Sequence, residues 1–255
     1  MSQFDWSEAR VGVVLGAGHG IGCALTEQLL GVHHEMIVFA SFRKTTKASK
    51  LLLLKEKYED RLYIFQYDMT VENDIRAFFE RVSSRCVYID CLINAIGILD
   101  QDSMHPEKSL NQIKPDYLME YFRVNAIATP LIAKHAIDFF SKEKISIFAT
   151  LSAKVGSIED NSLGGWYGYR ASKAALNMFL KNIAIEYLNR KKLCIVLSLH
   201  PGTTKTDLSQ PYIKKTSLIV HTVSETAINM LQVIQKCTIK ESGSFFSWDG
   251  EKLPW

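Results

Sequence analysis

Tyr169 and Lys173 are the first pair of residues whose types and spacing could do chemistry. They stand four positions apart in the stretch GGWYGYRASKAAL, residues 164–176, and a helix would place them on one face. A free phenol has a pKa of about 10, and a nearby ammonium stabilises its ionised form, so the pair could exchange a proton near neutral pH. For a lone pair, a half-buried tyrosine beside a solvated lysine is the better interpretation, so the rest of the chain must decide.

A glycine-rich turn is the second chemical candidate. Gly16, Gly20 and Gly22 follow the apolar run at 11–15 and open a helical pattern. Small residues let backbone N–H groups approach a pyrophosphate at a helix N-terminus, where the helix dipole favours an anion. The alternative is a turn that only needs positive φ angles. Its place between the first strand and the first helix favours a dinucleotide site.

Apolar runs that would position these residues alternate with amphipathic stretches along the chain. The predicted strands are 11–15, 36–41, 62–67, 89–95, 145–151, 193–199 and 243–247, and the predicted helices are 20–30, 46–59, 71–84, 116–140, 169–189 and 223–236. This alternation is typical of a parallel sheet covered on both faces. We therefore expect an α/β fold: a single domain over residues 1–255, with a Rossmann-like, doubly wound parallel sheet. Ligands should bind beyond the carboxyl ends of its strands, where the long loops 99–115 and 201–221 also lie.

Composition excludes several other classes of protein. The chain has 255 residues, is 47% hydrophobic and 22% charged, and carries a net charge of only +3, which favours a soluble globular enzyme without nucleic-acid or membrane partners. The cysteines show neither metal-ligand spacing nor a disulfide framework: Cys23, Cys86, Cys91, Cys194 and Cys237. No secretory signal or membrane-length apolar run is visible, so we expect a cytoplasmic protein without a metal site.

Taken together, the motifs and their order resemble the short-chain dehydrogenase/reductase family. The glycine turn with Tyr169-x-x-x-Lys173 is the most specific part of the likeness. Further landmarks follow the third, fourth and sixth predicted strands, namely Asp68-Met69-Thr70, Asn94-Ala95-Ile96-Gly97 and Pro201-Gly202. The resemblance covers the chain from about residue 11 to the final strand. The closing stretch SGSFFSWDGEKLPW and residues 156–167 look most like the C-factor and Sniffer-like carbonyl reductase branch.

The resemblance implies an oxidoreductase that interconverts a small carbonyl compound and an alcohol by hydride transfer from or to a nicotinamide cofactor. Tyr169 would be the general acid in reduction and the base in the reverse direction, Lys173 would support it and bond the nicotinamide ribose, and Asn125 would hold a water of a proton relay. It also implies a homo-oligomer with contacts through helices 116–140 and 169–189. The cofactor-binding residues that it implies are Gly16, His19, Gly20, Ile21, Gly22, Ser41, Arg43, Asp68, Met69, Asn94, Ala95, Gly97, Tyr169, Lys173, Pro201, Gly202 and Thr204.

The substrate-binding serine of the family does not align simply. Its pattern is Ser-x-x-Gly, but counting back from Gly156 gives Ala153, and Ser152 is one residue early. One step along a regular strand reverses the side-chain direction. We predict that Ser152 is the fourth catalytic residue through a local turn of the backbone; the alternative is another donor, of which Ser157 is the weaker candidate.

The end of the second predicted strand bears on cofactor choice. An acidic residue there would accept hydrogen bonds from the ribose of NAD(H), but residues 39–44 contain none. Ser41 and Arg43 suit a 2′-phosphate instead, and His19 in the glycine turn could border it. We therefore predict NADP(H), with NAD(H) as the alternative. A cofactor-binding regulatory or signalling protein with little turnover is the rival function, because fold alone does not fix function.

Overall fold

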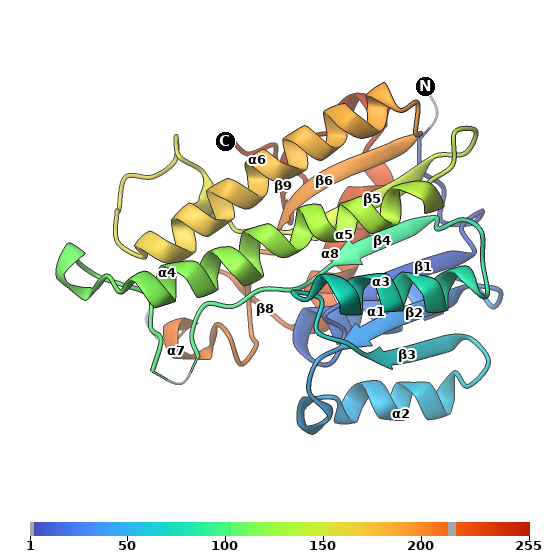
Figure 1. Cartoon of the computed structure of the whole chain (residues 1–255), viewed down its shortest axis with the longest axis horizontal. Helices are drawn as coiled ribbons and strands as arrows, with labels where there is room; N and C mark the ends of the chain where they lie inside the picture. Colours follow the sequence, from blue (N-terminus) through green and yellow to red (C-terminus); the bar gives the residue numbers. More distant parts are fainter. Residues whose placement is uncertain (1–2, 102, 214–217) are drawn as a thin grey trace.

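The centre of the molecule is a seven-stranded parallel sheet (Figure 1). The computed structural model describes residues 3–101, 103–213 and 218–255. The strands are β1 (Val11–Leu15), β2 (Ile37–Phe42), β3 (Leu62–Gln66), β4 (Cys91–Asn94), β5 (Ser146–Leu151), β6 (Cys194–His200) and β9 (Ser244–Ser247). They lie in the order β3-β2-β1-β4-β5-β6-β9, so the order reverses at β1, between β2 and β4. The predicted fold class is confirmed.

Helices cover both faces of this sheet because its strands are apolar on both sides. One core joins the sheet to α1 (Gly20–Val32), α2 (Ser49–Lys57) and α8 (Val223–Lys236). The other joins it to α3 (Glu72–Ser83), α5 (Ala128–Ala136) and α6 (Tyr167–Asn189), which lie in front of the sheet in Figure 1. Val13 and Val14 show the principle, since they are adjacent in β1 and fully buried in opposite cores.

The helix predicted at 116–140 is divided in the structure. It consists of α4 (Pro115–Phe122), a π-helical turn (Arg123–Ile127), α5 and a final 3₁₀ turn (Ile137–Phe139). Asn125 lies in the π turn, and its side chain bonds both backbone polar groups of Ile98, with Oδ1 accepting at 2.8 Å and Nδ2 donating at 3.0 Å. Single π turns within α-helices occur frequently at functional sites.

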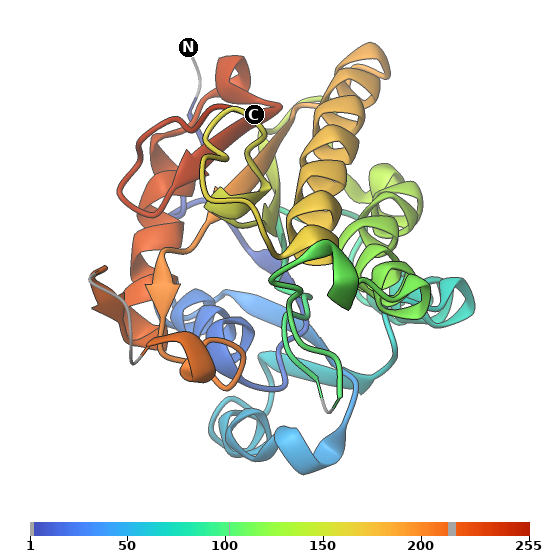
Figure 2. The ribbon, with the colours of Figure 1, turned by 90° about the vertical axis from the view of Figure 1, so that its left-hand side faces the viewer.

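Three segments surround the carboxyl edge of the sheet, which faces the viewer in Figure 2. They are the loop between β4 and α4, the loop between β5 and α6, and the chain after β6, which carries the short elements β7 (Thr203–Thr204), α7 (Gln210–Ile213) and β8 (Val220–His221). The predicted loops 99–115 and 201–221 fall here, although residues 102 and 214–217 lie outside the described residues. This edge holds the candidate site.

Candidate active site

Tyr169 and Lys173 come together in the first turns of α6. Both side chains are buried, with 8% and 3% of their surface exposed, and Nζ of Lys173 lies 5.9 Å from the centre of the Tyr169 ring. Nζ donates to the backbone oxygen of Leu151, at the end of β5, over 3.0 Å. An ammonium has three N–H donors. Within the described residues, two of them therefore remain available to a ligand.

Burial sets the electrostatics of this pair. It raises the pKa of the Tyr169 phenol well above its usual value, and it lowers the pKa of Lys173 to about 8. Burial is the cause of the rise in the pKa of Tyr169. The phenol is consequently protonated at neutral pH, as a proton donor must be.

Asn125 approaches Lys173 across Gly97. A Cβ atom at Gly97 would stand 3.4 Å from Nζ of Lys173 and 3.5 Å from Oδ1 of Asn125. Nδ2 of Asn125 also donates to Oγ of Ser172 at 3.1 Å, beside Lys173 in α6. The π turn, the loop after β4 and α6 thus bring three of the four predicted catalytic residues into one group.

Ser152, the fourth predicted catalytic residue, lies directly after β5 with its hydroxyl committed elsewhere. Its Oγ donates to Oδ1 of Asn177 in α6 at 2.7 Å, and Oγ of Ser198 donates to the same oxygen at 2.8 Å. Ala153, the residue that the family pattern aligns with serine, instead belongs to the apolar cluster that contains Tyr169. A substrate-binding role for Ser152 stays a prediction. Ser157, the weaker candidate, donates to the backbone oxygen of Trp255 at 3.2 Å.

The glycine turn packs tightly between β1 and α1. A Cβ atom at Gly22 would stand 2.3 Å from the backbone oxygen of Gly16, so only glycine fits there. Gly16 has φ +79° and lies against the backbone of Ala95 and Ile96. Gly20 and Gly22 therefore leave the backbone at the start of α1 without side chains at two of its first three positions, as the approach of an anion to the helix N-terminus requires. Ile21 packs partly buried against the core.

Basic residues gather beside this turn. Burial lowers the pKa of His19, and the positive charges of Lys47 and Arg43 lower it further, whereas Asp207 opposes them. Arg43 follows β2 directly and is exposed. Ser41 differs from the expectation: it is fully buried, and its Oγ accepts a long hydrogen bond of 3.4 Å from the N–H of Gly16. Ser41 therefore supports the turn from beneath.

Other predicted cofactor residues lie at the ends of β3 and β4. Oδ1 of Asp68 accepts from the backbone and side chain of Thr70, and these bonds, with the charges of Arg43 and Arg123, outweigh burial and lower the pKa of Asp68. Met69 is buried in the core on the α3 side. Asn94 is buried and joins β4 to α5 by donating to Oγ1 of Thr129 at 3.1 Å.

The chain after β6 completes the site. Gly202 has φ +72°, and a Cβ atom there would stand 2.7 Å from Trp248, so the turn after Pro201 packs on that ring. Thr204 is buried and bonds Oγ1 of Thr226 at 2.8 Å. Thr206 was not predicted, although its methyl group lies 3.6 Å from the Cβ position of Gly20, against the glycine turn.

Aromatic side chains next to Tyr169 form a group that was not predicted from the sequence. The Trp166 ring meets the Tyr169 ring edge-on at 6.0 Å, and it meets the Tyr212 ring at 5.0 Å. The Tyr212 hydroxyl donates to Oδ2 of Asp100 at 2.7 Å, which joins the two long loops. Only the density of aromatic residues around position 166 hinted at this arrangement.

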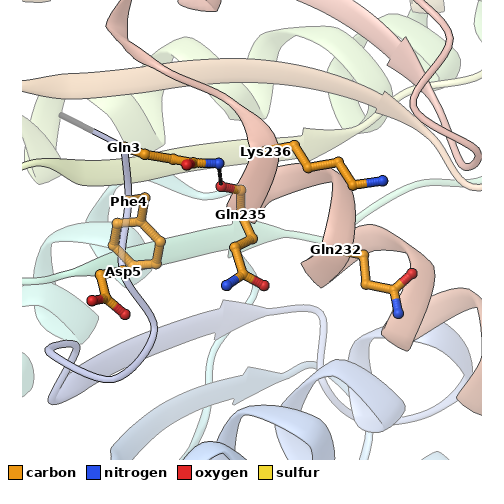
Figure 3. Close-up of a pocket in the computed structure, with 6 residues that line it drawn as sticks. All are labelled: Gln3, Phe4, Asp5, Gln232, Gln235 and Lys236. Atoms are coloured by element: carbon orange, nitrogen blue, oxygen red, sulfur yellow. Dashed lines mark hydrogen bonds between the residues drawn. The ribbon is translucent and has the colours of Figure 1, made fainter. Parts of the chain in front are cut away.

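A surface depression of about 490 Å³ lies away from this site, between the N-terminal segment and α8 (Figure 3). It is lined by Gln3, Phe4, Asp5, Gln232, Gln235 and Lys236. None of these residues belongs to the predicted site. Over the described part of the chain, no group of side chains suits a metal ion, and no helix is long and apolar enough to cross a membrane.

The residues present fit a nicotinamide dinucleotide. The glycine turn leaves the start of α1 open to a pyrophosphate, the basic group near His19 suits a phosphate, and Lys173 holds unused donors beside Gly97. These three features follow one another along the carboxyl edge, from β2 across β1 and β4 to β5. This is the switch point at which doubly wound sheets bind dinucleotides.

The chain is similar to known proteins over most of its length. The model of the short chain dehydrogenase family matches residues 10–217. A 1-hydroxy-2-glutathionyl-2-methyl-3-butene dehydrogenase of Rhodococcus sp. (strain AD45) is 28% identical over 243 residues, which cover 95% of this chain and 98% of the relative.

Two solved structures share the fold over nearly their whole lengths. An NADPH-bound carbonyl reductase from chicken fatty liver has a TM-score of 0.85 at 28% identity, covering 97% of this chain and 99% of that one. Carbonyl reductase Sniffer of D. melanogaster also has a TM-score of 0.85, at 22% identity, covering 97% of this chain and 100% of that one. The resemblance stated from the sequence is confirmed.

Proposed function

The chain belongs to the short-chain dehydrogenase/reductase family, an oxidoreductase family that uses nicotinamide cofactors, and we propose that it is an NADP(H)-dependent reductase of small carbonyl compounds. The observation that carries the proposal is the buried phenol of Tyr169, held protonated beside an ammonium with two unused donors. NADP(H) is favoured over NAD(H) by the basic group of His19, Arg43 and Lys47 beside the glycine turn.

Several residues of this chain have separate roles in the proposed reduction. The cofactor, when bound, supplies the hydride. Tyr169 donates its proton to the carbonyl oxygen, and Lys173 stabilises the resulting phenolate and holds the cofactor ribose. Asn125, fixed by Ile98, borders the route by which a proton returns from solvent to Lys173. The apolar residues around the phenol, including Ala153 and Trp166, exclude water and accept the carbon skeleton of the substrate.

A second function keeps some support from the neighbourhood of Ser152. With the Ser152 hydroxyl on Asn177 and a methyl group at Ala153, the site has one donor fewer for the substrate oxygen than the family pattern. This favours the rival candidate, a cofactor-binding regulatory or signalling protein with little turnover.

The consumption of NADPH across a panel of aldehydes, ketones and diketones separates the two functions. We expect turnover of at least one carbonyl compound, with NADPH preferred to NADH. Tight NADPH binding with no turnover on any member of the panel would contradict the reductase and favour the regulatory protein.

We also propose that the protein forms a homo-oligomer. Met178, Ile185 and Leu188 lie along one stripe of α6 at helical spacing, and each leaves half or more of its surface exposed. Met119 on α4 and Ile127 in the π turn are also exposed. Such apolar stripes are the surfaces that a second copy of the chain would cover.

A further inference from the structure

Glu107 is a buried carboxylate that contacts the start of the helix carrying Tyr169. It lies in the loop between β4 and α4 and is only 1% exposed. Its Oε2 accepts the N–H of Gly168 at 3.1 Å, and its backbone oxygen accepts the N–H of Trp166 at 2.5 Å. Both donors come within the three residues before Tyr169. Two contacts from one residue of another loop therefore fix the start of α6.

The start of α6 lacks a side-chain cap of its own. Trp166 holds the N-cap position in the left-handed region, with φ 51°, after Gly164 and Gly165 at 63° and 65°. The first N–H groups of a helix have no partners within it, and a carboxylate is the favoured group to accept them because of the helix dipole. Glu107 fills this place from outside the helix.

Capping from a distance leaves the N-cap position to an aromatic residue. A serine, threonine or aspartate at position 166 would cap the helix locally. Trp166 instead packs edge-on against Tyr169. Burying a carboxylate costs free energy of folding unless hydrogen bonds compensate for the lost water. Oε1 of Glu107 has no such partner within the described residues. A costly group of this kind, placed next to a reacting residue, indicates a role in the reaction.

We propose that Glu107 is a positioning residue for catalysis: by holding the N–H groups of Trp166 and Gly168, it fixes the phenol of Tyr169 and the Trp166 ring beside it. The opposite side of this turn is already fixed by Tyr121, whose ring leaves no room for a Cβ atom at Gly168, the distance being 2.5 Å. Removing the Glu107 side chain frees the N–H of Gly168 on the other side of the turn, while the backbone bond from Trp166 remains. The proposal rests on the proposed reductase function.

The test compares Glu107→Ala and Glu107→Gln with a matched control, Glu241→Ala. Oε2 of Glu241 also accepts a backbone N–H, that of Thr238 at 2.7 Å. Glu241 lies in a short helix (Ile239–Glu241) that precedes β9, at the end of the sheet opposite the carboxyl edge. The full-length proteins are assayed with NADPH and phenanthrenequinone. Glu107→Ala should lower kcat by about tenfold to a hundredfold, as a misplaced reacting group does. NADPH affinity should stay within about twofold, since Glu107 does not touch the glycine turn.

The two other variants separate positioning from general stability. Glu107→Gln keeps the size and one acceptor oxygen, so it should restore most of kcat. Glu241→Ala should lower Tm as Glu107→Ala does but leave kcat unchanged. An unchanged kcat in Glu107→Ala, with only a lower Tm, would overturn the proposal. If Glu107→Ala does not fold, Glu107→Asp replaces it: the shorter side chain should lower kcat, and normal kcat would overturn the proposal.

Amide hydrogen exchange at residues 166–170 keeps this proposal distinct from the proposed function. Exchange at Gly168 should be about tenfold faster in Glu107→Ala than in the wild type, as expected when a local opening becomes easier. If the wild type shows no turnover but the variant still exchanges faster, the reductase function is contradicted, whereas the contact between Glu107 and Gly168 is not. Unchanged exchange at Gly168 would overturn the positioning role itself.

Discussion

Nζ of Lys173 lies 5.9 Å from the centre of the Tyr169 ring, and burial acts on both groups in the same sense. It disfavours the charged form of each, so the pKa of the phenol rises while the pKa of the ammonium falls to about 8. The phenol therefore stays protonated until a basic oxygen comes within hydrogen-bond distance of it. This suits Tyr169 to the donation of a proton to a carbonyl oxygen as it gains negative charge.

The buried Lys173 makes stability depend on pH. Its pKa is about 8 in the folded protein and 10.5 ordinarily, so between these values the unfolded chain binds more protons than the folded one. The free energy of unfolding consequently rises with pH between about 8 and 10.5 because of this group. Lys173→Met should be more stable than the wild type near pH 7, and this advantage should shrink by on the order of 2 to 3 kcal/mol at pH 10. Urea unfolding at both pH values measures it; an advantage that stays constant would contradict the buried ammonium.

Arg43 should decide between the two cofactors. Charge-assisted hydrogen bonds to a 2′-phosphate contribute about 1.5–3 kcal/mol, so Arg43→Ala should weaken NADPH binding by roughly tenfold or more and leave NADH binding unchanged. Arg76→Ala, an exposed arginine of α3, is the control and should change neither. Fluorescence titration gives the four affinities. Equal affinity of the wild type for NADPH and NADH would disprove the NADP(H) preference.

Ser152 and Ser198 form a matched pair on Oδ1 of Asn177. Each donates one hydrogen bond, at 2.7 and 2.8 Å, so Ser152→Ala and Ser198→Ala should each reduce stability by about 1 kcal/mol. With the hydroxyl of Ser152 committed to Asn177, we expect turnover to fall by less than about tenfold in both variants. A far larger loss in Ser152→Ala alone would show that Ser152 turns toward the substrate and takes the place of the family's serine.

Exposed apolar residues on α6 should hold an oligomer together. Sedimentation at micromolar concentration is expected to give a dimer or a larger species for the wild type. Met178→Lys combined with Ile185→Lys should yield a monomer, because charge is placed in the apolar stripe. Leu53→Lys, at an exposed position of α2, should not. A monomeric wild type would refute this prediction.

Most of the fold was predictable because apolar runs and turn residues act locally. The seven strands and the glycine turn follow from alternation along the chain, and most boundaries differ by at most two residues, where helix and strand ends fray, whereas α2 begins three residues later than predicted. The π turn at Asn125 was not predictable, because the hydrogen bonds that its side chain makes go to Ile98, 27 residues away in the sequence. Periodicity reports one continuous helix across such a turn.

The parts of the site that depend on side-chain direction were least accessible from sequence. Ser152 and Ala153 are neighbours, and only the backbone path after β5 decides which of them faces Tyr169. Ser41 was expected at the cofactor phosphate, but its hydroxyl lies beneath the glycine turn. Glu107 had no recognisable pattern, because its partners Trp166 and Gly168 are some 60 residues away.

Substitution of Tyr169 by phenylalanine tests the central claim most directly. The change removes only the hydroxyl group, so the ring contacts with Tyr121 and Trp166 should survive. Cooperative melting and NADPH binding are the controls, and both should match the wild type. General acid catalysis contributes about two to four orders of magnitude, so the rate of NADPH-dependent reduction should fall by that factor in Tyr169→Phe. A Tyr169→Phe protein that reduces the same carbonyl compound at a near-normal rate would contradict the proposed mechanism.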